Sequence, residues 1–191
     1  MRRWKRVDTA DGPRFVSSMD AHEVVLLRNM ATSMQEMLDD RQSGSPSDPL
    51  EQITGIRTGN TSPPADDTLR RLLPDFVSAD SAEADKSESN GALRSLHEPQ
   101  IIDTKISAAQ RLLDGLPTDG GRVDLSEDDA NAWIAAINDL RLTLGTILDI
   151  GPDVPDQLPE GHPMAQHLDV YHWLSFLQEC LVLGLMGKPI R

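Results

Sequence analysis

The last third of the sequence contains two long segments in which apolar residues recur at three- and four-residue spacing. The first runs from Ser126 to Asp149. Ser126 and the three acidic residues after it are typical of a helix N-terminus, and Gly151 with Pro152 ends the pattern. Its apolar stripe consists of Trp133, Ile137, Leu140, Leu144, Ile147 and Leu148. This spacing predicts an amphipathic helix, with Asp139 lying away from the apolar stripe.

The second segment, from His162 to Gly187, predicts another helix, with Pro163 in the first turn. Its main stripe consists of Val170, Trp173, Leu174, Leu177, Leu181 and Leu185. Near its end the apolar character spreads around the helix, through Val182, Leu183 and Met186. A helix that is apolar all round is either buried centrally or covered by a partner subunit. Leu142, on the exposed side of the preceding helix, favours an added interface, and we expect a homo-oligomer, a dimer.

Upstream, residues 2–7 and 14–17 flank a turn containing Asp11 and Gly12, which predicts a β-hairpin. Asp20 and Glu23 have capping-box spacing and open a predicted helix that reaches about Arg41. Its apolar face contains Leu26, Leu27, Met30, Met34, Met37 and Leu38. The three methionines fit either an adaptable binding groove or core packing, and core packing is the favoured interpretation.

The middle of the chain is less regular. Residues 42–66 and 75–92 are rich in Gly, Ser, Pro and acidic residues, and we predict two long flexible loops, the second alternatively a poorly packed helix. A short helix precedes Pro74, and a longer one runs through residues 99–116. Residues 121–126 fit a short third strand that joins the hairpin. The prediction is therefore a mainly α (α+β) single domain over residues 1–191, a compact bundle of about four main helices with a small N-terminal β-hairpin.

The charge distribution is uneven. The chain carries a net charge of −13, which argues against a protein that binds nucleic acid over its whole surface. The first residues oppose this charge with Arg2, Arg3, Lys5 and Arg6, and the aromatic side chain of Trp4 lies among them in the sequence. They fit either a patch that binds an acidic partner or nucleic acid, or a solvated hairpin that docks on the acidic body; we favour the hairpin.

Cys180 is the single cysteine, so an internal disulfide and a cysteine-rich zinc site are excluded. Its place beside the apolar stripe predicts a buried side chain. A redox role would require a lowered thiol pKa, and the sequence shows no basic neighbour that would lower it. The basic start is not followed by the apolar stretch of a signal peptide, and no apolar run is long enough for a bilayer. We expect a cytoplasmic protein.

Motifs that carry chemistry are missing from the sequence. It contains no GxSxG, HExxH, Walker or dinucleotide-binding motif. His162, His167 and His172 are five residues apart, so successive side chains are rotated by about 140° around a helix and cannot share one face as metal ligands. We predict no catalytic residues, no cofactor and no metal, and therefore no enzyme.

Several long blocks of the chain do resemble a known family. They are MRRWKRV, TGNTSPPADDTLRRLLPDF, LRSLHEP, EDDANAWIAAINDLRLTLGT and HPMAQHLDVYHWLSFLQECLVLGLMG. Together they resemble an actinobacterial family of unknown function, some of whose members are described as oxidative-stress transcriptional regulators (AosR-like). The resemblance implies a thiol switch and contact with the transcription machinery, such as a sigma factor. Position 184 is Gly184, however, so a CxxxC switch cannot operate within this chain.

These observations rank the possible functions. The first is a non-enzymatic regulator linked to transcription or the oxidative-stress response, acting through protein–protein contacts that include Val182, Leu183, Met186 and Leu142. The alternatives are a direct DNA-binding regulator that uses the basic hairpin and an uncharacterised structural or interaction domain. An enzyme with an unfamiliar site ranks last.

Overall fold

The computed structural model describes residues 4–44, 57–77, 83–151 and 162–188. In chain order the elements are β1 (Lys5–Thr9), β2 (Gly12–Met19), α1 (Ala21–Ser43), α3 (Asp67–Leu72), α4 (Glu83–Gly115), β3 (Gly121–Leu125), α5 (Glu127–Ile147) and α6 (Ala165–Leu185). The fold is mainly helical with one small antiparallel sheet, which confirms the predicted fold class.

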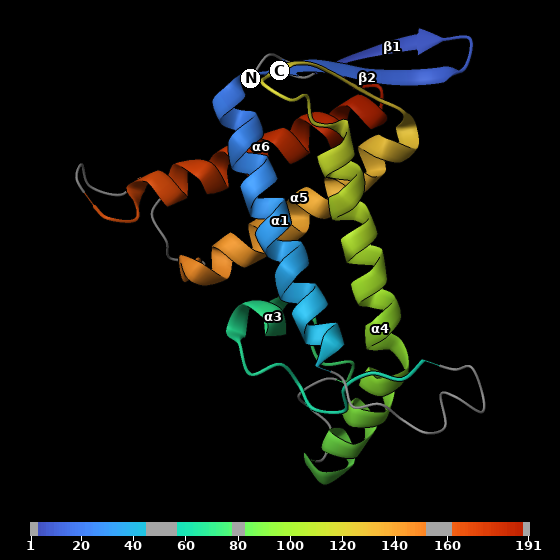
Figure 1. Ribbon diagram of the computed structural model, residues 1–191, viewed down its shortest axis with the longest axis vertical. Helices are drawn as coiled ribbons and strands as arrows, with labels where there is room; N and C mark the ends of the chain where they lie inside the picture. Colours follow the sequence, from blue (N-terminus) through green and yellow to red (C-terminus); the bar gives the residue numbers. More distant parts are fainter. Residues whose placement is uncertain (1–3, 45–56, 78–82, 152–161, 189–191) are drawn as a thin grey trace.

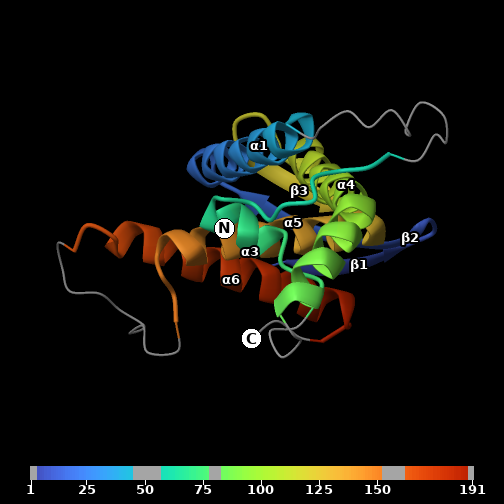
Figure 2. The same cartoon turned by 90° about the horizontal axis from the view of Figure 1, so that it is seen from below.

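Helix α5 lies at the centre. It packs against α4, α3 and α6 and touches the sheet, and Figure 2 shows it between the layer of α1 and α4 and the layer of α6. Trp133, Ile137 and Leu140 are fully buried, as the spacing predicts. Asp139, predicted to lie away from the apolar stripe, is also buried. The reason is that α4 covers a second face of α5.

The sheet has the strand order β1-β2-β3, antiparallel throughout. Thr9 pairs with Gly12, and Gly12 takes a φ of +108°, which a residue with a side chain rarely adopts, at the hairpin turn. The predicted third strand is confirmed, with Phe15 opposite Leu125. Alternate residues of β2 face inward, and Phe15 and Met19 join the core. The inner face of the hairpin therefore packs against the hydrophobic core.

Two helix starts follow the predicted capping chemistry. Asp20 accepts a hydrogen bond from the Glu23 amide and closes a capping box on α1, and Ser126 does the same with Asp129 on α5. The start of α6 differs from the prediction. The helix begins at Ala165, and Pro163 lies in the turn before it.

Helix α4 is longer than predicted: it begins at Glu83, so this part of residues 75–92 forms the helix that was the alternative to a loop. The prediction placed Pro99 at the start of a helix, whereas Pro99 lies inside α4. Of the loop predicted at 42–66, residues 45–56 lie outside the described residues, and residues 57–66 follow an irregular path against α1 and α4.

A specific contact explains how α4 continues through Pro99. Proline has no amide hydrogen, so the carbonyl of Ser95, four residues earlier, lacks its helical donor. The Gly59 amide supplies one at 2.7 Å. Residue 59 has to be small, because a side-chain carbon there would lie 2.8 Å from Cγ of Pro99. The Gly59 amide thus supplies the hydrogen bond to Ser95 that Pro99 cannot donate.

A buried ionic cluster lies next to this contact. Glu98, 1% exposed, accepts hydrogen bonds from Arg94 at 2.6 Å and from Arg41 of α1 at 2.8 Å. Arg94 is equally buried and also donates to the carbonyl of Leu73 at 3.1 Å and to Asp75 at 2.9 Å. The cluster joins α1, α4 and the segment that follows α3.

We expect Gly59→Ala to lower the free energy of unfolding by about 1–3 kcal/mol, because the added methyl overpacks against the Pro99 ring. Equilibrium urea denaturation measures the change. Gly151→Ala is the control, since no atom lies within 4 Å of its added methyl, and its effect should stay within about 0.5 kcal/mol. Equal effects of the two substitutions would contradict this account.

Arg94→Met should cost about 3–5 kcal/mol, because it leaves the buried Glu98 carboxylate short of one of its two cations. The matched substitution is Arg57→Met. The Arg57–Asp103 ion pair is about half exposed, with side chains 52% and 53% accessible, and its loss should cost about 0–1 kcal/mol. Chemical denaturation of both variants tests the contrast, and a loss at Arg94 no larger than that at Arg57 would show that the cluster does not stabilise the fold.

Candidate functional site

The structure brings two sets of predicted partner-binding residues close together. Strand β1 contacts α6, and Figure 1 shows the sheet beside the C-terminal end of that helix. A side-chain carbon added at Gly187 would lie 3.6 Å from the Arg6 guanidinium. Val182 is 37% exposed and Met186 58% exposed. We call this region the α6–β1 surface and define it by Arg6, Phe176, Val182, Leu183 and Met186; Lys5, next to Arg6 in β1, lies on the opposite face of the sheet, since it pairs with Val16 whereas Arg6 pairs with Phe15.

Phe176 extends this surface along the helix. It is 43% exposed, and it lies seven residues before Leu183, hence on nearly the same helix face. Leu183 itself is half-buried. Phe176 was not among the predicted partner-binding residues, although its position on the side of the helix away from the apolar stripe indicated that it would be exposed. The surface thus combines apolar side chains with the exposed cation of Arg6, which is paired with Asp8 at 3.1 Å.

Trp4 does not belong to this surface, which corrects the prediction. It is 3% exposed, and its ring meets that of Trp133 edge to face, with centroids 5.9 Å apart. A ring in this position cannot stack on a nucleic-acid base. Leu142, predicted to face a partner, is half-buried and packs against the core. Arg2 and Arg3 lie outside the described residues.

Cys180 is 1% exposed, which confirms its predicted burial. Gly184, one turn further on, is also buried, and a side-chain carbon there would lie 3.3 Å from the Phe15 ring. A larger residue at position 184 therefore requires Phe15, and with it β2, to shift.

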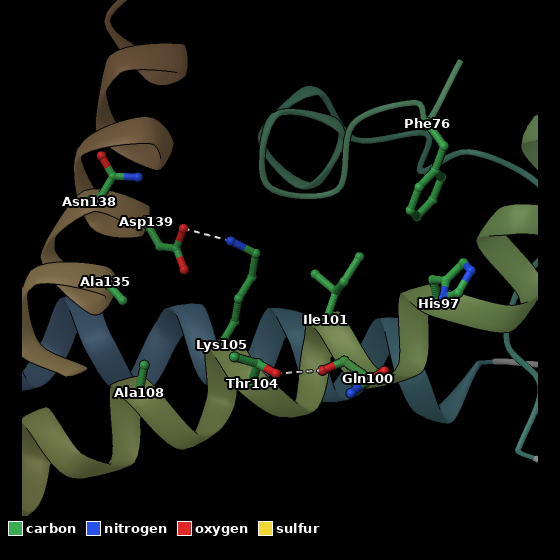
Figure 3. Close-up of a pocket in the computed structure, with 10 residues that line it drawn as sticks. All are labelled: Phe76, His97, Gln100, Ile101, Thr104, Lys105, Ala108, Ala135, Asn138 and Asp139. Atoms are coloured by element: carbon green, nitrogen blue, oxygen red, sulfur yellow. Dashed lines mark hydrogen bonds and ion pairs between the residues drawn. The ribbon is translucent and has the colours of Figure 1, made fainter. Parts of the chain in front are cut away.

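A pocket of about 540 Å³ opens between α4 and α5 (Figure 3). Lys105 of α4 donates a 2.7 Å hydrogen bond to Asp139 of α5 at one side of it. Burial raises the pKa of the Asp139 carboxyl, and the Lys105 ammonium partly opposes this shift. The sequence gave no signal for this pair, whose partners lie on different helices.

The remaining groups in this pocket do not assemble with the ion pair. Figure 3 shows His97 and Asp139 at opposite ends. His97 packs near the Phe76 ring, with centroids 6.1 Å apart, and the Thr104 hydroxyl donates to the Gln100 carbonyl of its own helix. Across the described residues, no three His, Cys, Asp or Glu side chains are grouped so that they could hold a metal ion. The ion pair joins α4 to α5.

The fold and these surfaces define a small, mainly helical protein with apolar side chains exposed along one helix, α6. The chain belongs to the family of the domain of unknown function DUF2017, which matches residues 1–185. The family resemblance drawn from the sequence is thus confirmed.

Among its relatives is a protein of Mycobacterium tuberculosis named oxidative stress regulator AosR, 61% identical over 195 residues that cover 98% of this chain and 89% of the relative. The protein of the same name from Mycobacterium bovis matches to the same extent. A putative oxidative stress regulator AosR of Mycobacterium leprae is 55% identical over 194 residues, with the same coverage. The names describe regulators and not enzymes. No solved structure matches the chain.

None of the helices in the described ranges is long and apolar enough to cross a membrane.

Asp139 and Asp129 should change stability with opposite dependence on pH. Burial raises the pKa of folded Asp139 above its ordinary 3.8, so the folded protein binds this proton more tightly and stability falls as pH rises from 3.8 through the folded pKa. The pKa of Asp129 is lowered, chiefly by the Ser126 hydroxyl, so its contribution is present above 3.8 and is lost as pH falls through the folded pKa.

Urea denaturation of Asp139→Asn and Asp129→Asn across acidic to neutral pH measures both contributions. The difference in unfolding free energy, wild type minus variant, should decrease with rising pH for Asp139→Asn and increase for Asp129→Asn. A difference that increases with pH for Asp139→Asn would show that burial does not destabilise the Asp139 carboxylate, and one that decreases for Asp129→Asn would contradict the account of Asp129.

Proposed function

We propose that this chain is a non-enzymatic regulator of the oxidative-stress response that acts by binding another protein of the transcription machinery. The names of its relatives support the regulatory role. The observation that carries the contact mechanism is the α6–β1 surface, where exposed apolar side chains of α6 adjoin the Arg6 cation of β1.

The chemistry of this surface indicates the kind of partner. Interface cores are built from aromatic and aliphatic side chains, and Phe176, Val182 and Met186 supply them here. Arg6 adds positive charge to this surface in a chain whose net charge is −13. A partner surface with an apolar centre and an acidic edge would be complementary to both, because opposite charges steer association and fix orientation.

The oxidative signal, in this proposal, does not enter through a thiol pair in the chain. Cys180 is the single cysteine and is buried. Reaction with an oxidant requires an exposed thiolate, which this position does not offer. Regulation would therefore follow from the amount of the chain or from the state of its partner.

A second copy of the chain is the competing occupant of the α6–β1 surface. Apolar residues at 37–58% exposure on one helix are compatible with a symmetric dimer. Direct DNA binding is not proposed, because burial of Trp4 leaves the hairpin without the aromatic side chain that the DNA-binding hypothesis used.

The double variant Phe176→Ser, Met186→Ser should lose its partner. Quantitative affinity capture from host cells, with and without peroxide, is expected to recover one specific transcription protein with the wild type and at least about tenfold less with the variant, because truncation of central apolar anchors costs more than about 1 kcal/mol each.

The control is Val25→Ser, which removes an apolar side chain that is 51% exposed on α1. Sedimentation of the purified proteins separates the two occupants. Undiminished capture by the double variant contradicts the proposal, and a wild-type dimer that the double variant dissociates, with no partner captured, assigns the surface to self-association.

A further inference from the structure

An apolar groove of about 430 Å³ lies on another part of the molecule, between α1 and the adjoining ends of α5 and α6. The start of α3 lies at its margin through Asp66 and Thr68. Its apolar lining includes Met30, Met34 and Met37 from α1, Leu140 and Ile147 from α5, and Val170 from α6. None of the residues that define the α6–β1 surface lines this groove.

The lining is only partly used for packing. Met34 is buried, as core packing predicts, but Met30 and Met37 are half-buried and Ile147 is 57% exposed. Methionine side chains are unbranched and adapt to the shape of what they contact. The methionine stripe therefore serves the core on one side and an open groove on the other.

The shape of the groove fits a helix. On α1 it extends from Leu26 to Met37, which corresponds to about 16 Å along the helix axis. This length matches three turns of a second helix, enough to place anchors at positions i, i+3, i+4 and i+7. The walls are helices, so they offer no strand edge for an extended peptide to join.

The rim of the groove is mainly acidic. Glu36 and Asp40 are exposed on α1, one turn from the lining residues Ser33 and Met37. Asp66 adds an exposed carboxylate that lines the groove.

The cations nearest the groove are largely engaged elsewhere. Arg41 is bonded to Glu98, Arg141 to Ser175 and Gln178, and Arg70 forms an ion pair with Asp67. Arg71, on α3, is an exposed cation one turn from Thr68, beside three carboxylates, those of Glu36, Asp40 and Asp66, that lie in or near the groove. No lysine or arginine is among the described residues that line the groove.

We infer that this groove docks an amphipathic α-helix of a partner protein, with apolar residues on one face and lysine or arginine beside them. The inference rests on the proposed function only in that the chain works through protein contacts. It adds a second contact site to the α6–β1 surface and states the chemistry of the segment that binds there.

The probe is a fluorescent peptide of about 14 residues, three to four helical turns, with leucine at i, i+3, i+4 and i+7 and lysine at most other positions. Fluorescence anisotropy measures its binding to the full chain. Two control peptides accompany it, one with the same composition and alternating leucines, the other with glutamate in place of lysine. We expect saturable binding of the probe and at least about tenfold weaker binding of each control.

Two pairs of protein variants locate the site. Ser33→Lys puts a positive charge on an exposed lining residue, whereas Thr32→Lys puts the same charge on the adjacent exposed residue away from the groove. Ile147→Ser removes an anchor contact, and Phe176→Ser removes one from the α6–β1 surface. Ser33→Lys and Ile147→Ser should weaken the probe about tenfold, and the other two should leave it unchanged.

Failure of the probe to bind overturns the inference. Equal binding of either control peptide, or equal effects within each variant pair, also overturns it. A wild-type dimer that Ser33→Lys dissociates also overturns it, because the occupant is then a second copy of this chain. Capture of a cellular partner that is lost with Phe176→Ser, Met186→Ser but kept with Ser33→Lys retains the proposed function and rejects the groove.

Discussion

The carboxylate of Glu98 is held inside the protein by two guanidinium groups, and much of the structure depends on this arrangement. A buried charge is costly unless every part of it is paired, and here Arg94 and Arg41 reach Glu98 from two helices while Arg94 also binds Leu73 and Asp75. The cluster fixes α1 beside α4 and holds the segment after α3 against both. Helix α5 packs against the layer of α1 and α4 on one side and against α6 on the other.

The sequence was sufficient where a local rule decides the structure. The capping residues Asp20 and Ser126 predict the starts of α1 and α5, and the structure confirms the short third strand expected at residues 121–126. The sequence was insufficient where the deciding partner is distant. A helix start at Pro99 is the local prediction, whereas α4 continues through Pro99 because the Gly59 amide, from 40 positions earlier, donates to the Ser95 carbonyl. Asp139 was placed outside the core because Lys105, its partner, lies on another helix.

The candidate surfaces show the same division. The sequence shows the apolar excess at the end of α6 but leaves open whether it is buried centrally or lies at the surface; in the structure Val182 and Met186 are exposed. Trp4 was grouped with its basic neighbours because they adjoin it in the chain, yet the fold turns its ring inward against Trp133. The groove between α1, α5 and α6 requires the packing of three helices, so the methionine spacing alone could not distinguish it from core. The two contact regions that we propose therefore differ in charge, with the Arg6 cation at one and carboxylates beside the other on α1.

The pairing of Gly59 with Pro99 also bears on how sequences of this family can change. Replacing Pro99 by another residue restores the helical donor for the Ser95 carbonyl and removes the ring that excludes a side chain at position 59. While Pro99 is kept, residue 59 must remain glycine. The order of substitutions is therefore constrained: position 99 has to change first, and the two positions should covary among family members although they lie in different kinds of structure.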